Sequence, residues 1–132
     1  MAIDRAVVYG DSSAPVKLVI DAAFLEPVET IATSRMAEVE VERATRIANA
    51  SVEVARDTRA LLESCVLIDV TRDILRSAAG LASLRVRSLD AIHLATALRL
   101  GADTFVAYDD RLCAAARARG LLVAAPGTAP SF

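Results

Sequence analysis

Short runs of β-branched and aliphatic residues alternate with longer segments of helical character along nearly the whole chain. The expected strands are Val7–Tyr9, Thr30–Thr33, Cys65–Val70, Thr104–Tyr108 and Leu121–Val123. Their shortness and apolar character are typical of strands buried on both faces of a sheet. Because a helix between two such strands makes a crossover connection, the strands run parallel and helices cover both faces. The alternation therefore predicts a three-layer α/β fold, in which helices flank a central parallel sheet of about five strands.

Capping residues divide the intervening segments into helices. We expect helices over residues 15–23, 34–49, 52–63, 71–80, 88–100 and 109–119. Residues whose side-chain oxygen can accept a hydrogen bond from the first turn stand at the helix starts. They are Ser12, Ser13, Ser34, Ser51, Thr71, Ser88 and Asp109. Two of the helices are expected to end at Gly101 and Gly120, because glycine adopts the left-handed conformation of a C-terminal cap at little cost.

The length fits one domain. A chain of 132 residues, 55% of them hydrophobic, buries roughly two-thirds of its surface on folding. We expect a single domain over residues 1–125 and a C-terminal tail over residues 126–132, where proline, glycine and serine gather. No apolar run reaches the ~18 residues of a membrane span, and the first residues lack the pattern of a secretory signal. The sequence is therefore interpreted as a cytoplasmic protein without membrane contact.

The charged residues and the cysteines exclude several classes of site. The net charge is −2, and the 15 basic residues are 14 arginines and Lys17. This balance disfavours nonspecific coating of nucleic acid but allows a local basic rim, since the arginine fork suits phosphate. Cys65 and Cys113 stand 48 positions apart without a CxxC motif. Neither a zinc site nor a disulfide framework is indicated.

Two acidic residues directly follow predicted strands. Asp11 comes after the first strand and Asp109 after the fourth. Ligands of parallel sheets bind beyond the carboxyl ends of the strands, so these two side chains are candidates for one site. Each also precedes a helix, where an aspartate N-cap stabilises the first turn by about 1 kcal/mol. Capping alone is therefore an alternative for both residues.

Two further acids are expected on helix faces that point toward the core. Glu40 falls on an apolar stripe with Met36, Ala44 and Ile47, where a carboxylate needs a cation or hydrogen bonds. Its alternative partner is an arginine, Arg43 or one elsewhere. Asp90 opens a segment that is apolar all round and so is expected to be buried.

As an alternative, Asp90 could act only through its favourable interaction with the helix dipole, which stabilises an acid in the first turn. Together the four acids could converge on one pocket, where a divalent cation would balance their repulsion. Oxygen ligands favour Mg²⁺ or Mn²⁺, which assist hydrolysis of phosphodiesters. The sequence leaves open whether one or two ions bind.

Four segments containing these acids resemble the PIN domain family. They are residues 8–18 (VYGDSSAPVKL), 34–44 (SRMAEVEVERA), 87–97 (RSLDAIHLATA) and 106–112 (VAYDDRL). In particular they are similar to the VapC toxins of type II toxin–antitoxin modules. The resemblance covers essentially the whole chain, and the order of its acids agrees with the order found above.

The resemblance implies a PIN fold and an endoribonuclease that depends on Mg²⁺ or Mn²⁺. It also implies an RNA substrate, silencing by a cognate VapB-type antitoxin, and a homodimer. By motif position, the metal-site residues would be Asp11, Glu40, Asp90 and Asp109, and Asp110 would be a peripheral carboxylate. The RNA target class, the cleavage sequence and the antitoxin cannot be identified from these residues.

Three positions depart from the pattern of the family. Gly10 replaces a bulky aliphatic residue, Pro15 replaces an aliphatic residue, and Ala107 stands where a hydroxyl often supports the last acid. Loss of that hydroxyl would weaken the hydrogen bonding around a bound metal. None of the departures removes an acid.

Several residues are candidates for a supporting role. His93 could act as a general acid or orient a ligand, although we favour a packed histidine that ties its helix to a neighbouring element. Ser12 and Ser13 could hydrogen-bond Asp11 or a metal-bound water. Arg87 is a candidate phosphate contact, with a solvated surface position as the alternative. With no tryptophan and five Phe and Tyr residues, extensive base stacking is not expected.

Two rival functions remain. One is a PIN-fold module that binds RNA or protein without cutting it. The other is a phosphoaspartate enzyme with Asp11 as nucleophile, which is disfavoured because the sole lysine, Lys17, follows the first strand rather than a later one. The apolar faces of helices 34–49 and 52–63 are expected to contact a second copy or the antitoxin.

Overall fold

A computed structural model describes residues 7–14, 30–81 and 85–125. Its five strands are β1 (Val7–Gly10), β2 (Thr30–Ser34), β3 (Val66–Ile68), β4 (Thr104–Val106) and β5 (Leu122–Ala124). They form one sheet in the order β3-β2-β1-β4-β5, and every neighbouring pair is parallel. The predicted parallel sheet is confirmed.

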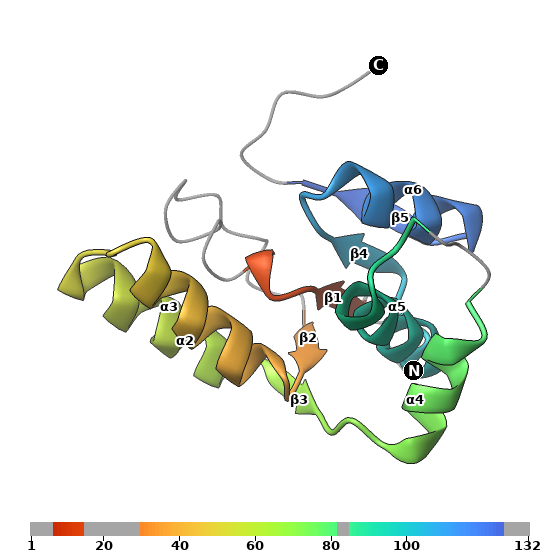
Figure 1. Cartoon of the computed structure of the whole chain (residues 1–132), viewed down its shortest axis with the longest axis horizontal. Coiled ribbons are helices and arrows are strands. Elements are labelled where there is room, and N and C mark those ends of the chain that lie inside the picture. The colour runs from red at the N-terminus through yellow and green to blue at the C-terminus, as the bar shows by residue number, and fades with distance from the viewer. Residues whose placement is uncertain (1–6, 15–29, 82–84, 126–132) are drawn as a thin grey trace, which may run out of the picture.

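Helices cover both faces of this sheet (Figure 1). The described helices are α2 (Ala37–Ile47), α3 (Val52–Ser64), α4 (Arg72–Ala79), α5 (Ser88–Leu100) and α6 (Asp110–Ala118). Helices α5 and α6 pack on the face that carries Tyr9, whereas α3 packs on the face that carries Val8. The helix expected over residues 15–23 lies outside the described residues. None of the described helices has the length and apolar character needed to cross a membrane.

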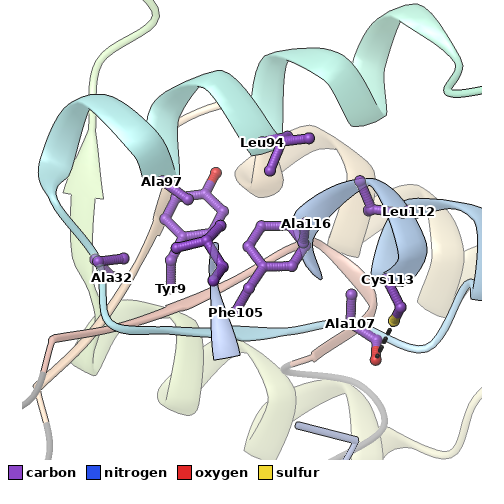
Figure 2. Close-up of a cluster of buried hydrophobic side chains, with 11 residues drawn as sticks. Tyr9, Ala32, Leu94, Ala97, Phe105, Ala107, Leu112, Cys113 and Ala116 are labelled. Atoms are coloured by element: carbon purple, nitrogen blue, oxygen red, sulfur yellow. Dashed lines mark hydrogen bonds between the residues drawn. The ribbon is translucent and has the colours of Figure 1, made fainter. Parts of the chain in front are cut away.

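The main core lies between the sheet and helices α5 and α6 (Figure 2). Tyr9 of β1 and Phe105 of β4 stack with their ring centroids 5.6 Å apart and their planes at 6°. Small residues of the two helices, among them Ala97 and Ala116, pack against these rings. Their size lets both helices approach the aromatic pair closely, which fixes the central strands and the residues that follow them.

Most of the predicted helix starts are confirmed, and two are not. Ser51 and Thr71 accept hydrogen bonds from the N–H groups of the first turns of α3 and α4. Ser34 instead ends β2, and its hydroxyl accepts a hydrogen bond from the N–H of Met36, just before α2 begins. Ser88 is the first residue of α5, whose N-cap is Arg87 without a side-chain cap. Neither hydroxyl caps its predicted helix, because α2 begins only after Met36 and α5 already includes Ser88 as its first residue.

The predicted apolar stripe of α2 is wrong. The buried residues of this helix are Ala37, Val41 and Thr45, whereas Ile47 is 77% exposed. The reason is that α2 packs on Leu62 of α3 as well as on the sheet, so the neighbouring helix selects its buried face. Glu40 precedes Val41 and therefore lies at the border of that face, 23% exposed.

Gly10, the first departure from the family pattern, is explained by close packing. A Cβ atom at this position would lie 2.9 Å from the Cβ of Ala14, closer than two such atoms can approach. We expect Gly10→Ala to lower the free energy of unfolding by about 1–3 kcal/mol, as overpacked sites do. Thermal and urea unfolding would measure this loss. The double variant Gly10→Ala, Ala14→Gly should recover most of it, and equal losses in both variants would contradict the steric explanation.

Candidate active site

The four acids singled out in the sequence come from four different elements around the carboxyl ends of the central strands. Asp11 directly follows β1, and Asp109 lies three residues beyond β4. Asp90 lies in the first turn of α5, and Glu40 lies on α2, which follows β2. The fold therefore brings together residues that are far apart in the sequence, as the parallel topology requires.

Asp11 is the most enclosed of these acids, with only 5% of its surface exposed. Its Oδ1 accepts hydrogen bonds from the hydroxyl of Ser13 at 2.5 Å and from the N–H of the same residue at 3.1 Å. Burial raises the pKa of the Asp11 carboxyl, while these hydrogen bonds and nearby His93 act in the opposite direction. A carboxylate kept in such a place at neutral pH favours a nearby positive charge.

Glu40 contacts a histidine rather than an arginine. Its Oε1 lies 2.8 Å from Nε2 of His93. The other ring nitrogen of His93, Nδ1, lies 2.7 Å from the hydroxyl of Tyr9. His93 is fully buried and ties α5 to both β1 and α2, in agreement with the structural interpretation of this residue. The arginine partners considered for Glu40 are therefore replaced by His93.

Asp90 is in electrostatic contact with the rest of the group. Burial raises the pKa of its carboxyl, and the negative charges of Asp109 and Glu40 raise it further. His93 and Arg87 act in the opposite direction. Asp90 in turn raises the pKa of Asp11. The pKa shifts of Asp11 and Asp90 thus both include the charge of another acid of the group, as is typical of a shared site.

Asp109 occupies the position of an N-cap. Its Oδ1 accepts a hydrogen bond from the N–H of Leu112 at 3.0 Å, and α6 begins at the next residue, Asp110. Both aspartates are exposed. Asp109 therefore caps the helix, as the alternative interpretation proposes, and its charge still reaches Asp90.

The basic residues near this edge include one that the sequence analysis missed. Arg87 is exposed at the start of α5, close enough to lower the pKa of Asp90. Arg35 directly follows β2 and pairs with Asp69 at 2.7 Å and with Glu38 at 3.2 Å. A signal for Arg35 was available, because it follows a predicted strand as Asp11 and Asp109 do. Ser12 is half-buried beside Asp11.

The donor set fits a hard divalent cation, although the site is not closed around one. Within residues 7–14, 30–81 and 85–125, no three Asp, Glu, His or Cys side chains are close enough together to hold a metal ion. Mg²⁺ keeps several waters and often binds only one or two carboxylates directly. The buried Asp11 and the neighbouring acids offer oxygen ligands only, which is the ligand chemistry that such an ion prefers.

Most of the chain matches the model of a known protein family. Residues 6–118 match the model of the PIN domain. The chain belongs to the PIN domain family. The matched range of this PIN domain includes the four acids discussed above, Asp11, Glu40, Asp90 and Asp109.

Curated relatives of this PIN domain are ribonucleases. Ribonuclease VapC46 of Mycobacterium tuberculosis is 40% identical over 130 residues, which cover 92% of this chain and 98% of the relative. Ribonuclease VapC47 of the same species is 31% identical over 134 residues, with the same coverage of both chains. The order of acids proposed from the sequence thus occurs in a chain whose relatives carry the VapC name.

Solved structures share the fold at low sequence identity. VapC20 of Mycobacterium tuberculosis, a toxin that cleaves the sarcin–ricin loop, matches with a TM-score of 0.64 at 18% identity, covering 82% of this chain and 94% of that one. VapBC2 of Rickettsia felis, bound to a promoter DNA fragment, matches with a TM-score of 0.65 at 13% identity, covering 89% and 97%. The PIN-like α/β architecture is confirmed.

Proposed function

We propose that this chain is the toxin of a type II toxin–antitoxin module, an endoribonuclease that cleaves RNA phosphodiester bonds in the cytoplasm with Mg²⁺ or Mn²⁺. The observation that carries this proposal is the electrostatic grouping of Asp11, Asp90, Asp109 and Glu40 around a carboxyl edge where Asp11 is buried. The identity to VapC ribonucleases along the chain supports the same activity.

In this proposal Asp11 and Asp90 bind the cation most directly, because burial disfavours the negative charge of both carboxylates. Glu40 and Asp109 complete the negative field from α2 and from the start of α6. When bound, the cation would polarise the scissile phosphate and lower the pKa of an attacking water. Ser13 holds one oxygen of Asp11 and so orients the carboxylate.

The residues around the acids would handle the RNA. Arg87 is exposed beside Asp90, where its guanidinium can pair with a phosphate of the substrate. Ser12 is placed to hydrogen-bond a water of the cation. Asp110 is exposed at the start of α6 and is given no direct role. Because the chain has few aromatic residues, recognition would rest on phosphate contacts and RNA shape rather than on stacking.

Incubation of the purified protein with total RNA tests the activity. We expect cleavage with Mg²⁺ or Mn²⁺ and none with EDTA, and readdition of Mg²⁺ should restore it. Asp90→Asn should be inactive under all conditions, because it removes one of the charges that hold the cation. Its matched control is Asp73→Asn on α4, an exposed aspartate that should keep full activity.

Cleavage that persists in EDTA would contradict the metal-dependent mechanism. Binding of RNA without cleavage under every metal condition would favour the alternative, a non-catalytic PIN module. The phosphoaspartate alternative loses its support because the chain belongs to the PIN domain family, and because its sole lysine, Lys17, follows the first strand rather than a later one.

The partners are proposed to be a VapB-type antitoxin and a second copy of the chain. We place the predicted interface on α2 and α3, whose apolar faces the sequence pattern indicates as contacts. The structure leaves Val39, Ile47 and Val52 exposed there, at 62%, 77% and 76%. Exposed apolar residues that gather on one helix pair are typical of interaction surfaces.

We expect the double variant Ile47→Glu, Val52→Glu to weaken such an association by at least about tenfold, because it places charges in an apolar contact. Light scattering of the protein alone measures dimerisation, and co-purification with a co-expressed VapB-type antitoxin measures complex formation. Leu122→Glu, at an equally exposed residue of the opposite sheet edge, is the control. Unchanged association in both assays would remove α2 and α3 from the interface.

A further inference from the structure

A continuous chain of hydrogen bonds runs from the central strand to the acidic site. The Tyr9 hydroxyl lies 2.7 Å from Nδ1 of His93, and Nε2 of His93 lies 2.8 Å from Oε1 of Glu40. Tyr9 and His93 are both fully buried, whereas Glu40 is partly exposed. This series of hydrogen bonds therefore starts in the core and ends at one of the proposed cation-binding carboxylates.

With Glu40 ionised and the His93 ring neutral, the chemistry of the three groups fixes the direction of these hydrogen bonds. An ionised carboxylate can only accept, so Nε2 of His93 donates its proton to Glu40. Nδ1 then carries no proton when the ring is neutral, and it accepts from the Tyr9 hydroxyl. Removing that hydroxyl would leave Nδ1 buried without a donor and free the ring to adopt its other tautomer. The tyrosine thus selects the form of His93 that binds Glu40.

Aromatic packing holds the ring of Tyr9, the first residue of this series of hydrogen bonds. The Tyr9 ring stacks on Phe105 with centroids 5.6 Å apart, and it meets the His93 ring edge-on at 5.8 Å and 63°. Glu40 has no such packing, and within the described residues its carboxylate hydrogen-bonds only to His93. The orientation of this carboxylate consequently depends on a histidine whose own orientation depends on Tyr9.

Tyr9 also stands two residues before Asp11 on the strand that leads into the site. We propose that Tyr9 is a positioning residue that acts through His93 to hold the Glu40 carboxylate in place for a divalent cation, so that β1 places both Asp11 and Glu40. This inference rests on the proposed function, because it assumes that Glu40 faces the cation. It assigns no step of the reaction to Tyr9 or His93.

Nuclear magnetic resonance of the wild-type protein gives the first test. His93 is the sole histidine of the chain, so its ring nitrogens are identified without assignment. With Mg²⁺ titrated in, we expect the proton on Nε2 to shift in a saturable way, because the cation draws charge from the oxygen that accepts this proton. Imidazole signals that stay constant while Mg²⁺ binds would overturn the proposal.

Calorimetric titration with Mn²⁺ gives the second test. Tyr9→Phe keeps the stacked ring and removes only the hydroxyl, and we expect about tenfold weaker Mn²⁺ binding, as is typical when a partner of a metal ligand is lost. In a Glu40→Gln background the same change should have no further effect, since the tyrosine acts through Glu40. Thr58→Val is the matched control, because it removes a fully buried hydroxyl that lacks a hydrogen-bond partner in the described structure.

The outcomes separate this inference from the proposed function. If Glu40→Gln weakens Mn²⁺ binding and Tyr9→Phe does not, the site is correct and the role of Tyr9 is wrong. If Tyr9→Phe and Thr58→Val weaken binding equally, the effect is one of general packing and the proposal is overturned. If the wild-type protein binds neither Mg²⁺ nor Mn²⁺, the proposed function itself fails.

Discussion

Replacement of Asp11 by Asn is expected to abolish RNA cleavage and to stabilise the metal-free protein at the same time. The loss of activity should be at least about 100-fold, since even partners outside the ligand shell of a metal contribute up to that factor. The amide keeps an oxygen that can accept both hydrogen bonds from Ser13. Only the buried negative charge is removed, so the two effects have one cause.

The stabilising effect follows from the direction of the pKa shift. Burial raises the pKa of Asp11 in the folded protein above its ordinary value. The folded state therefore holds its proton to higher pH than the unfolded state, and wild-type stability falls as the pH rises through that window. Asp11→Asn removes this fall. We expect a gain of about 1 kcal/mol at pH 7, typical for relief of a destabilised active site, and a smaller gain near pH 4.

Urea unfolding without metal at pH 7 and pH 4, together with RNA cleavage in Mg²⁺, measures both effects. Asp57→Asn makes the same chemical change at an exposed position of α3 and should alter neither quantity. A variant that cleaves RNA normally would remove Asp11 from the site. A variant that is inactive but less stable at pH 7 would show that the carboxylate is already neutralised within the metal-free fold.

Phe105→Ala should have the largest effect on stability. Phe105 is fully buried and provides the stacking partner of Tyr9 in the main core. Truncation of a buried phenylalanine typically costs about 3–5 kcal/mol. Since domains of this kind are stable by only about 5–15 kcal/mol, we expect a large decrease in the urea midpoint measured by circular dichroism.

Phe105→Leu retains much of the buried volume and is expected to lose less than half as much. Ala115→Gly on α6, at the border of the same core, controls for a general weakening of the helix layer. A loss below about 1 kcal/mol for Phe105→Ala would show that the core closes around the missing ring and that the stack does not anchor the central strands.

The parallel sheet could be predicted because short apolar runs and intervening helices are local features of the sequence. Strand lengths were less predictable. The segment Cys65–Val70 looks like a long strand, yet β3 spans only Val66–Ile68. This strand lies at the edge of the sheet and pairs with β2 alone, and Asp69 turns instead to Arg35. Pairing partners, which no local pattern contains, set where the strand ends.

Asp11 and Asp109 were located from their positions after strands, and Glu40 and Asp90 from their helix faces, but the hydrogen-bond partners of these acids were not predicted. The apolar stripe predicted around Glu40 was wrong. Packing between α2 and α3 decides which face of α2 is buried, and Ile47 of the predicted stripe stays exposed. His93 offered the better signal. A histidine inside an otherwise apolar helix needs hydrogen-bond partners when buried. Tyr9 and Glu40 were both available to supply them, and they are the pair that the fold brings to it.

Helices α2 and α3 form one connection between strands that are direct neighbours, β2 and β3. Both ends of this helical arm are fastened to the sheet, while its tip around residues 48–51 extends away from it (Figure 1). Lengthening or shortening the tip would therefore change how far the arm reaches without moving β1 or α5. Asp11 and Asp90 lie outside the arm, so the outer surface of the protein can change at this tip while these two acids keep their places.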